Sequence, residues 1–252
     1  MLNRLLTILC CTVAGLSGSP GLHAALPDFT VTYEVSRGAL TIGTARLALT
    51  REPGGGYHYE SHSWPAHLAG LFKKDRLHET SSGQFSESGL RPDKYHYLRT
   101  GGNKERVAHL TFDWDANVVV NNVAGSRWKM SIPVGTQDKL STRLGMMQAL
   151  GRGETDFTFD VADGGTLKQY RYQVLGRETL ELPAGTFSTV KVTELRGDER
   201  PRTWVWCAPA LNYLPVQIVR QEKNDAEYIS HLEGFSDTLR VRHEQLPPRP
   251  KP

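Results

Sequence analysis

Short runs of alternating apolar and polar residues, separated by turn signals, most constrain what this chain can fold into. In the first run Phe29, Val31, Tyr33 and Val35 share one phase, and the residues between them are polar. A period of two is typical of a β-strand with one buried face. Similar runs recur at 108–114, 128–132, 157–161, 170–174, 204–206 and 216–220. The sequence therefore predicts a mostly β fold.

Gly-, Asn- and Asp-rich turn signals lie between these runs and are only a few residues long. They are Gly54-Gly55-Gly56, Gly101-Gly102-Asn103, Asp115-Ala116-Asn117, Asp163-Gly164-Gly165 and Lys223-Asn224-Asp225. Such spacing is typical of hairpins and favours antiparallel pairing. About a dozen strands exceed what an open twisted sheet holds comfortably. We therefore expect a large curved antiparallel sheet, in the form of a barrel, half-barrel or sandwich, with one or two short helices.

One predicted strand changes phase in its middle. Leu40 and Ile42 share one phase, whereas the apolar residues of 45–49 take the other, and Gly43 lies between them. An extra residue in one strand of a pair shifts the phase in this way. The pattern predicts a bulge or bend at Gly43.

Residues 136–150 have a helical rather than a strand pattern. Asp138 can accept hydrogen bonds from the free amides of the first turn, and Gly151 can end the helix. The apolar residues at helical spacing are Leu140, Leu144, Met147 and Leu150, with Lys139, Arg143 and Gln148 off that face. A second segment, 65–74, begins with Pro65, which can open a short helical turn. We expect both segments to pack an apolar side onto the sheet or to plug its end.

The two ends of the chain differ in composition from the rest. Residues 1–24 carry one charge, an apolar run too short to span a bilayer, and small residues at the end, an order typical of a secretory signal peptide. We expect cleavage after Ala24, a single antiparallel β domain over 25–240, and a disordered proline-rich tail over 241–252. The predicted location is the periplasm, and no later apolar run is long enough to cross a membrane.

The net charge of +3 comes from the two ends. The chain has 30 Lys and Arg against 27 Asp and Glu, but Arg4 lies in the predicted signal and a net excess of two cations lies in the tail. Residues 25–240 thus carry equal numbers of basic and acidic side chains. Because nucleic-acid-binding proteins need a basic surface, this balance argues against a nucleic-acid partner.

Sequence motifs for catalysis and cofactor binding are absent. The chain has no GxGxxG, no GxxxxGK[ST] and no GxSxG. We therefore predict no catalytic residue and no cofactor, and a protein that is not an enzyme. Once the signal is removed Cys207 is the one cysteine left, which excludes an internal disulfide and a cysteine zinc site. No basic neighbour in sequence would activate its thiol, so we expect a buried small hydrophobic residue.

The segment with the most metal-like spacing is Tyr57-His58-Tyr59-Glu60-Ser61-His62. On a strand, His58, Glu60 and His62 share one face, where neighbours could contact a cation. The same alternation turns Tyr57 and Tyr59 to the opposite face, which is the better candidate for the core. We favour a solvated strand face here and predict no metal site.

Several separated motifs carry a resemblance to a known family. They are Tyr33-Glu34-Val35-Ser36-Arg37-Gly38 followed by Ile42-Gly43-Thr44-Ala45, then Gln137-Asp138-Lys139-Leu140-Ser141, Leu182-Pro183-Ala184-Gly185-Thr186-Phe187 with Val190-Lys191-Val192, Trp204-Val205-Trp206-Cys207-Ala208-Pro209 and Asn212-Tyr213-Leu214-Pro215-Val216. In order and spacing they resemble the bacterial exported family known as domain of unknown function 3108, over residues 29–235. The resemblance implies an all-β envelope protein without an established activity. By analogy its shape is similar to periplasmic lipoprotein carriers, in which a curved sheet holds acyl chains.

Our leading hypothesis is a non-enzymatic binding or carrier module for an apolar or lipid-like ligand. Its cavity would lie between the curved sheet and segments 65–74 and 136–150, because such pockets are mostly apolar. The candidate rim residues are Trp64, Leu68, Leu71, Phe72, Met146 and Met147. The alternative for these residues is that they fill the core. The alternative function is an envelope interaction or assembly-support protein with a protein partner, and a hydrolase is the third hypothesis.

Overall fold

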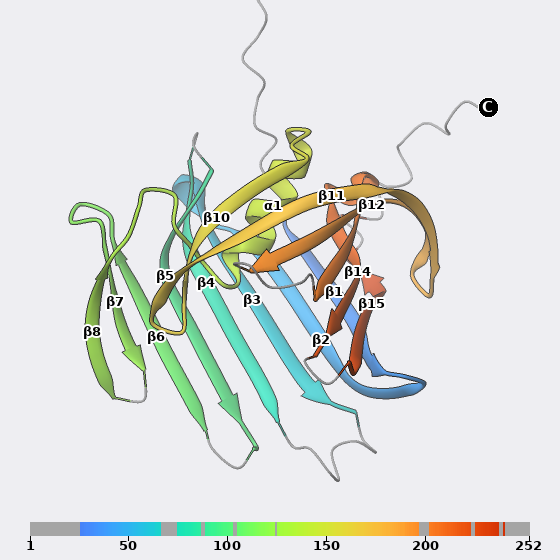
Figure 1. The fold of residues 1–252 in the computed structure, drawn as a ribbon, viewed down its shortest axis with the longest axis horizontal. Coiled ribbons are helices and arrows are strands. Elements are labelled where there is room, and N and C mark those ends of the chain that lie inside the picture. The colour runs from blue at the N-terminus through green and yellow to red at the C-terminus, as the bar shows by residue number, and fades with distance from the viewer. Residues whose placement is uncertain are drawn as a thin grey trace, which may run out of the picture.

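The computed structural model describes residues 26–66, 75–86, 89–102, 105–123, 125–196, 202–222, 225–236 and 239. Within them fifteen strands form one sheet, accompanied by one α-helix, α1 (Ser141–Gly151) (Figure 1). The strands are β1 (Phe29–Arg37), β2 (Leu40–Arg51), β3 (Gly56–Pro65), β4 (Arg76–Ser86), β5 (Gly89–Thr100), β6 (Arg106–Asp113), β7 (Val118–Val123), β8 (Ser126–Ser131), β9 (Gln137–Asp138), β10 (Asp156–Asp163), β11 (Thr166–Leu182), β12 (Gly185–Arg196), β13 (Thr203–Ala208), β14 (Leu214–Gln221) and β15 (Glu227–Phe235). The described residues also form two single 3-10 turns, η1 (Pro53–Gly55) and η3 (Pro209–Leu211).

The strands follow two antiparallel meanders that meet in the middle of the sheet. The order is β8-β7-β6-β5-β4-β3-β2-β1-β15-β14-β13-β12-β11-β10-β9, and the short β9 pairs in parallel with β10. The edges β8 and β9 are not paired with each other, so the sheet is curved but not closed. The predicted large curved antiparallel sheet is confirmed, as an open form.

The β9 end of the sheet folds back over the β4–β5 region instead of meeting the other edge. The amide nitrogen of the Gln137 side chain donates a 2.8 Å hydrogen bond to the Leu90 carbonyl of β5. Near the other edge, the indole nitrogen of Trp128 in β8 donates to the Gly165 carbonyl in the β10–β11 turn. Figure 1 shows β10 and β11 running across the concave side, with α1 behind them. The β9 end of the sheet therefore overlaps another part of the same sheet.

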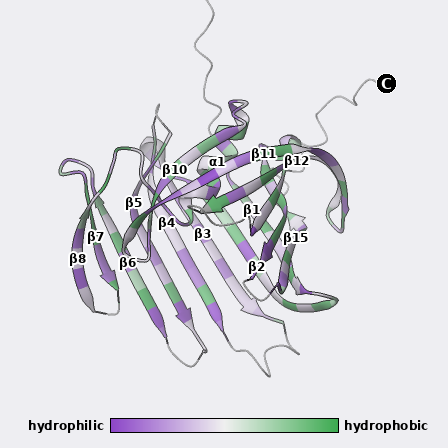
Figure 2. Ribbon diagram, viewed as in Figure 1, coloured by the Kyte–Doolittle hydropathy of each residue, from purple (hydrophilic) through white to green (hydrophobic). Residues whose placement is uncertain are grey.

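Alternation along the strands decides which side chains are buried. In β1, Phe29, Val31 and Tyr33 are at most 3% exposed, and the residues between them are half-buried. Figure 2 shows hydrophobic and hydrophilic residues alternating along the strands. The predicted turns Gly54-Gly55-Gly56, Asp115-Ala116-Asn117 and Asp163-Gly164-Gly165 join β2 to β3, β6 to β7 and β10 to β11.

The predicted bulge at Gly43 is confirmed. Val35 of β1 pairs with Gly43, but the next residue of β1, Ser36, pairs with Thr41. Ile42 is thus the extra residue of β2, and the phase of the apolar residues changes at this point.

Helix α1 begins at Ser141, so the start predicted at residue 136 is wrong. Gln137 and Asp138 pair with β10 as strand β9, and the chain turns into the helix only after them. The capping role predicted for Asp138 is confirmed, because its Oδ1 accepts 2.8 Å hydrogen bonds from the backbone amides of Leu140 and Ser141. The helix ends at Gly151, the predicted stop.

The helix packs on two sides rather than one, since it lies inside the overlap of the sheet. Leu144 and Met147 belong to a core cluster with the strands near β1, whereas Met146 and Leu150 belong to a second cluster with β10 to β13. All four are at most 3% exposed.

Other predictions fall partly or wholly outside the described residues. Pro65 is the last residue of β3 and does not open a helix, and 67–74 are outside. The predicted signal peptide, 1–24, and the predicted tail, 241–252, are outside as well. In the part of the chain that the structure describes, no helix combines the length and the apolar character needed to span a bilayer.

A candidate ligand pocket at one end of the sheet

A mainly apolar pocket of about 500 Å³ lies where the ends of β1 to β4 approach β15. Leu40 and Trp64 are 58% and 41% exposed, which is high for large apolar side chains. The apolar lining consists of Val35, Leu40, Ile42, Trp64, Pro65 and Leu77, with the ring of Tyr228. Ligand pockets of roughly 300–1,000 Å³ with apolar walls are typical of small-molecule sites.

The bulge at Gly43 shapes this pocket. It places both Ile42 and Leu40 at the pocket wall, beside Val35 of the neighbouring strand. Gly43 also lies against β3, because a Cβ atom built on it would come within 2.7 Å of the Trp64 carbonyl oxygen. A glycine therefore permits the close approach of β2 to the segment that carries Trp64.

Two charged side chains line the pocket together with its apolar residues. Asp75 is ion-paired with the guanidinium of Arg99. The guanidinium carbon of Arg37 lies 5.7 Å from the ring centroid of Tyr228, a cation–π distance. No ion pair joins Arg37 to a carboxylate of the described residues.

The interior beyond the pocket is filled by tyrosines with bonded hydroxyl groups. Tyr33 donates a 2.7 Å hydrogen bond to the Pro215 carbonyl, and Tyr95 donates a 2.6 Å bond to the Glu79 carboxylate. Tyr57 lies 3.1 Å from the Ser81 hydroxyl. Burial raises the pKa of Tyr33, Tyr57 and Tyr95 well above their ordinary value, so these phenols stay neutral. Tyr33, Tyr57 and Tyr95 therefore belong to the buried core and not to the lining of this pocket.

Asp138 is a fully buried acid beside Ser81, and Glu79 is buried as well. Burial raises its pKa to about 6, although hydrogen bonds from the Ser81 hydroxyl and from the amides of Ser141 and Leu140 favour the charged form. Both carboxylate oxygens are already used, one by Ser81 and one by the helix amides. Its role is structural.

A second pocket, of about 450 Å³, lies between β5, β6 and the β10–β11 turn. Its lining includes Lys139, whose ammonium lies 5.9 Å from the ring centroid of Tyr97, and Asp163, which is ion-paired with Lys168. Glu105 and Arg106 line it too. The charges make it less suited to an apolar ligand than the first pocket.

The six predicted rim residues have different positions. Trp64 lines the apolar pocket. Met146 and Met147 are 3% and 2% exposed, packed in the core clusters on either side of α1, and line neither of these pockets. Leu68, Leu71 and Phe72 lie outside the described residues.

The prediction missed most of the pocket wall. Leu40, Ile42 and Leu77 appear in the sequence as ordinary strand residues, and Tyr228 is distant along the chain. The one available signal was the change of phase at Gly43, which marks the irregular part of β2.

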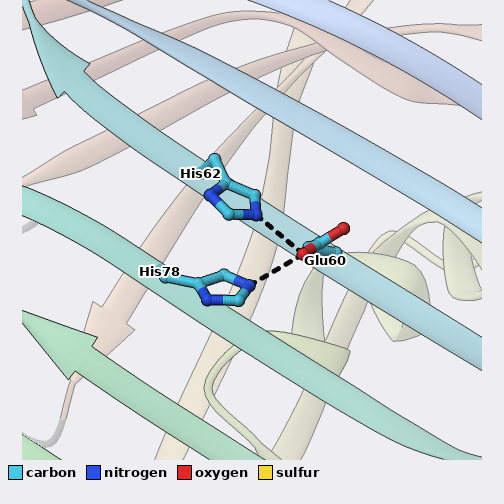
Figure 3. A network of polar contacts seen from close by, with 3 residues as sticks. All are labelled: Glu60, His62 and His78. Carbon is cyan, nitrogen blue, oxygen red and sulfur yellow. Dashed lines mark hydrogen bonds and ion pairs between the residues drawn. The ribbon is translucent and has the colours of Figure 1, made fainter.

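The outer face of β3 is solvated, as predicted from its alternation. Tyr57 and Tyr59 are buried, while Glu60 and His62 lie on the other face (Figure 3). The structure adds His78 of β4, whose contact with Glu60 could not be predicted from the spacing in the sequence. His58 is not part of this group.

The expectation for Cys207 is confirmed. Its side chain is fully buried in the cluster beside α1, and burial raises the pKa of its thiol well above the ordinary value. A thiol held neutral in an apolar surrounding is a poor nucleophile.

Comparison with protein families agrees with the motifs and the fold. A family model described as "Protein of unknown function (DUF3108)" matches residues 28–229. The chain belongs to the DUF3108 family. No curated protein matches this DUF3108 chain.

One solved structure resembles this DUF3108 protein, in fold alone. A β-barrel-like protein of domain of unknown function DUF1849 from Brucella abortus is 10% identical with a TM-score of 0.55, over 84% of this chain and 98% of that chain. A Bacteroides fragilis protein, described as a candidate exported protein with a YmcC-like fold, is 11% identical over 82% of this chain and 95% of its own. Its TM-score of 0.34 is too low to carry an argument.

Proposed function

We propose that this DUF3108 protein is a non-enzymatic binding or carrier protein that holds an apolar, lipid-like ligand at the end of its sheet. The observation that carries the proposal is the pocket in which exposed Leu40 and Trp64 face Ile42 and Leu77. Each buried CH₂ group of an acyl chain would gain about 0.8 kcal/mol in such a site.

Arg37 favours a ligand with an anionic end. It lines the pocket and has no carboxylate partner among the described residues. A carboxylate or phosphate group could form charge-assisted hydrogen bonds with the guanidinium while the chain contacts the apolar wall.

The lining of the pocket supports binding rather than catalysis. Thr44 and Ser63 contribute hydroxyl groups, but no histidine or cysteine is among the lining residues that the structure describes, and the carboxylate of Asp75 is ion-paired with Arg99. A hydroxyl nucleophile needs a base within hydrogen-bond reach.

A titration with a fluorescent long-chain fatty acid tests the proposal. We expect saturable binding that Leu40→Asp weakens at least about tenfold, because a negative charge would enter the apolar wall and repel the fatty-acid carboxylate. Leu175→Asp is the matched control, since Leu175 is 50% exposed and lies outside the pocket. Equal binding by both variants, or no binding by the unmodified protein, would contradict the proposal.

A second pair of ligands tests the anionic end. Arg37→Gln should weaken binding of the fatty acid and leave binding of the fatty alcohol of equal length unchanged. An equal loss for both ligands would mean that Arg37 acts through packing.

We also propose that the protein acts in the periplasm. The support is the order of charged, apolar and small residues in 1–24. The mass of the protein from a periplasmic extract should correspond to a chain that begins at Ala25, and a chain that retains 1–24 in the cytoplasmic fraction would contradict this.

A further inference from the structure

We propose that Glu60 and His62 of β3 and His78 of β4 form a binding site for a divalent transition-metal ion on the outer face of the sheet (Figure 3). The site is separate from the apolar pocket in function, and its test does not depend on a lipid-like ligand.

The three side chains converge on one point. Oε1 of Glu60 lies 2.7 Å from Nε2 of His62 and 2.8 Å from Nε2 of His78. One ligand atom from each residue lies within 4.8 Å of the others. In Figure 3 the two imidazole rings lie side by side and point toward the same carboxylate.

The register between β3 and β4 produces this convergence. His62 and His78 are direct partners across the two strands, and their rings stack with centroids 3.9 Å apart and planes 18° apart. Glu60 lies two residues before His62, on the same face. The ligand set is thus held by a hydrogen-bonded sheet rather than by loops.

Two imidazoles and a carboxylate are ligands that Zn²⁺, Cu²⁺ and Ni²⁺ accept. Metal–ligand bonds of about 2.0–2.2 Å place neighbouring ligand atoms of a tetrahedral ion roughly 3.3 Å apart. Oε1 of Glu60 is slightly closer than this to both imidazole nitrogens, so it would move away from them by about half an ångström as coordination replaces the hydrogen bonds. The side chains of Glu60, His62 and His78 are 34%, 46% and 31% exposed, which leaves room for that movement.

The surroundings leave part of the coordination sphere open. A pocket of about 440 Å³ borders the site and is lined by His62, Trp64, Arg76, His78 and Leu98, among others. Water or a small anion can reach the ion through it. Three protein ligands with one open position are typical of zinc sites that bind a further ligand.

The row of histidines continues beyond the site and supplies a matched control. His96 lies edge-on to His78, with ring centroids 6.4 Å apart, and stacks on His109 at 4.3 Å. His109 is exposed on the same sheet and is not among the three ligand residues.

Competition titration with a chromophoric chelator tests the site, with Zn²⁺ and protein purified without a polyhistidine tag. We expect one Zn²⁺ per chain, and a loss of affinity of at least about tenfold in His62→Ala, His78→Ala and Glu60→Gln. His109→Ala should bind like the unmodified protein. Absence of binding, or the same loss in His109→Ala, would overturn the proposal.

Two further measurements keep the result interpretable. The thermal midpoint of each variant without metal shows that it is folded, and His78→Gln replaces any His78→Ala protein that is not. Electron paramagnetic resonance of bound Cu²⁺ should show two imidazole nitrogens, and one in His62→Ala. An unchanged spectrum in that variant would place the ion elsewhere and overturn the proposal.

Discussion

The carboxylate of Asp138 accepts a 2.6 Å hydrogen bond from the hydroxyl of Ser81, which ties the start of α1 to strand β4. Tyr57 of β3 extends the contact, because its hydroxyl lies 3.1 Å from that of Ser81. The buried Ser81 hydroxyl therefore connects the helix cap to strands β3 and β4, where the sheet overlaps itself.

Replacing Asp138 by alanine should lower the free energy of unfolding by about 2–4 kcal/mol. The variant loses the helix cap and leaves the Ser81 hydroxyl and two backbone amides without their acceptor. Urea unfolding measures the change. Val134→Ala, at a nearby side chain that is 80% exposed, should change the value by less than about 0.5 kcal/mol. Similar losses in the two variants would contradict the structural role of Asp138.

The stability contributed by Asp138 should fall as the pH rises from about 4 to 6. Burial raises its pKa from 3.8 to about 6 in the folded protein. Between these values the folded state holds a proton that the unfolded state has released, so deprotonation on going to higher pH favours unfolding, by up to about 3 kcal/mol. The Asp138→Asn variant should lack this component. The measurement is the difference in unfolding free energy between the two proteins at several pH values, and a difference that is constant from pH 4 to 7 would contradict the shift.

A side chain at Gly43 should destabilise the protein and disturb the pocket. In Gly43→Ala the new Cβ would lie 2.7 Å from the Trp64 carbonyl oxygen, so β2 and β3 must separate, at a cost of about 1–3 kcal/mol. Gly234→Ala is the control, because a Cβ there meets nothing within 4 Å. The thermal midpoint of Gly43→Ala should be well below that of Gly234→Ala. Equal midpoints would show that β2 and β3 leave room for a Cβ atom at residue 43.

Cys207 should be unreactive until the protein unfolds. Its thiol is fully buried, and burial raises its pKa well above the ordinary value. Alkylation followed by peptide mass spectrometry distinguishes the label on Cys207 from any label on Cys10 or Cys11. The Cys207 peptide should be labelled slowly in buffer and rapidly in urea, and rapid labelling of the folded protein would contradict the buried position.

Alternation and turn residues predicted the strands well, because these patterns depend only on residues that are close together in the sequence. The bulge at Gly43 and the cap at Asp138 were predictable for the same reason. The start of α1 was not predictable, because Gln137 and Asp138 pair with β10 as a strand instead of joining the helix.

The two candidate sites depend on which strands become neighbours. Glu60 meets His78 through the register of β3 with β4, and Tyr228 reaches the pocket because β15 pairs with β1. The spacing of these residues in the sequence predicts neither of these contacts. Trp64 lies at the pocket because the alternation within its own strand, β3, places it on an exposed face. Met146 and Met147 are instead covered where the sheet overlaps itself.

The pairing of β1 with β15 has a consequence for how the chain folds. In chain order these are the first and last strands of the described residues, and residues such as Val31 and Phe235 must find each other across nearly the whole sequence. Pairing over such separations is slow, because a long loop must close before the contact is gained. The two halves can join only once the end of the chain is available, and until then β1 offers an unpaired edge to any other strand it meets.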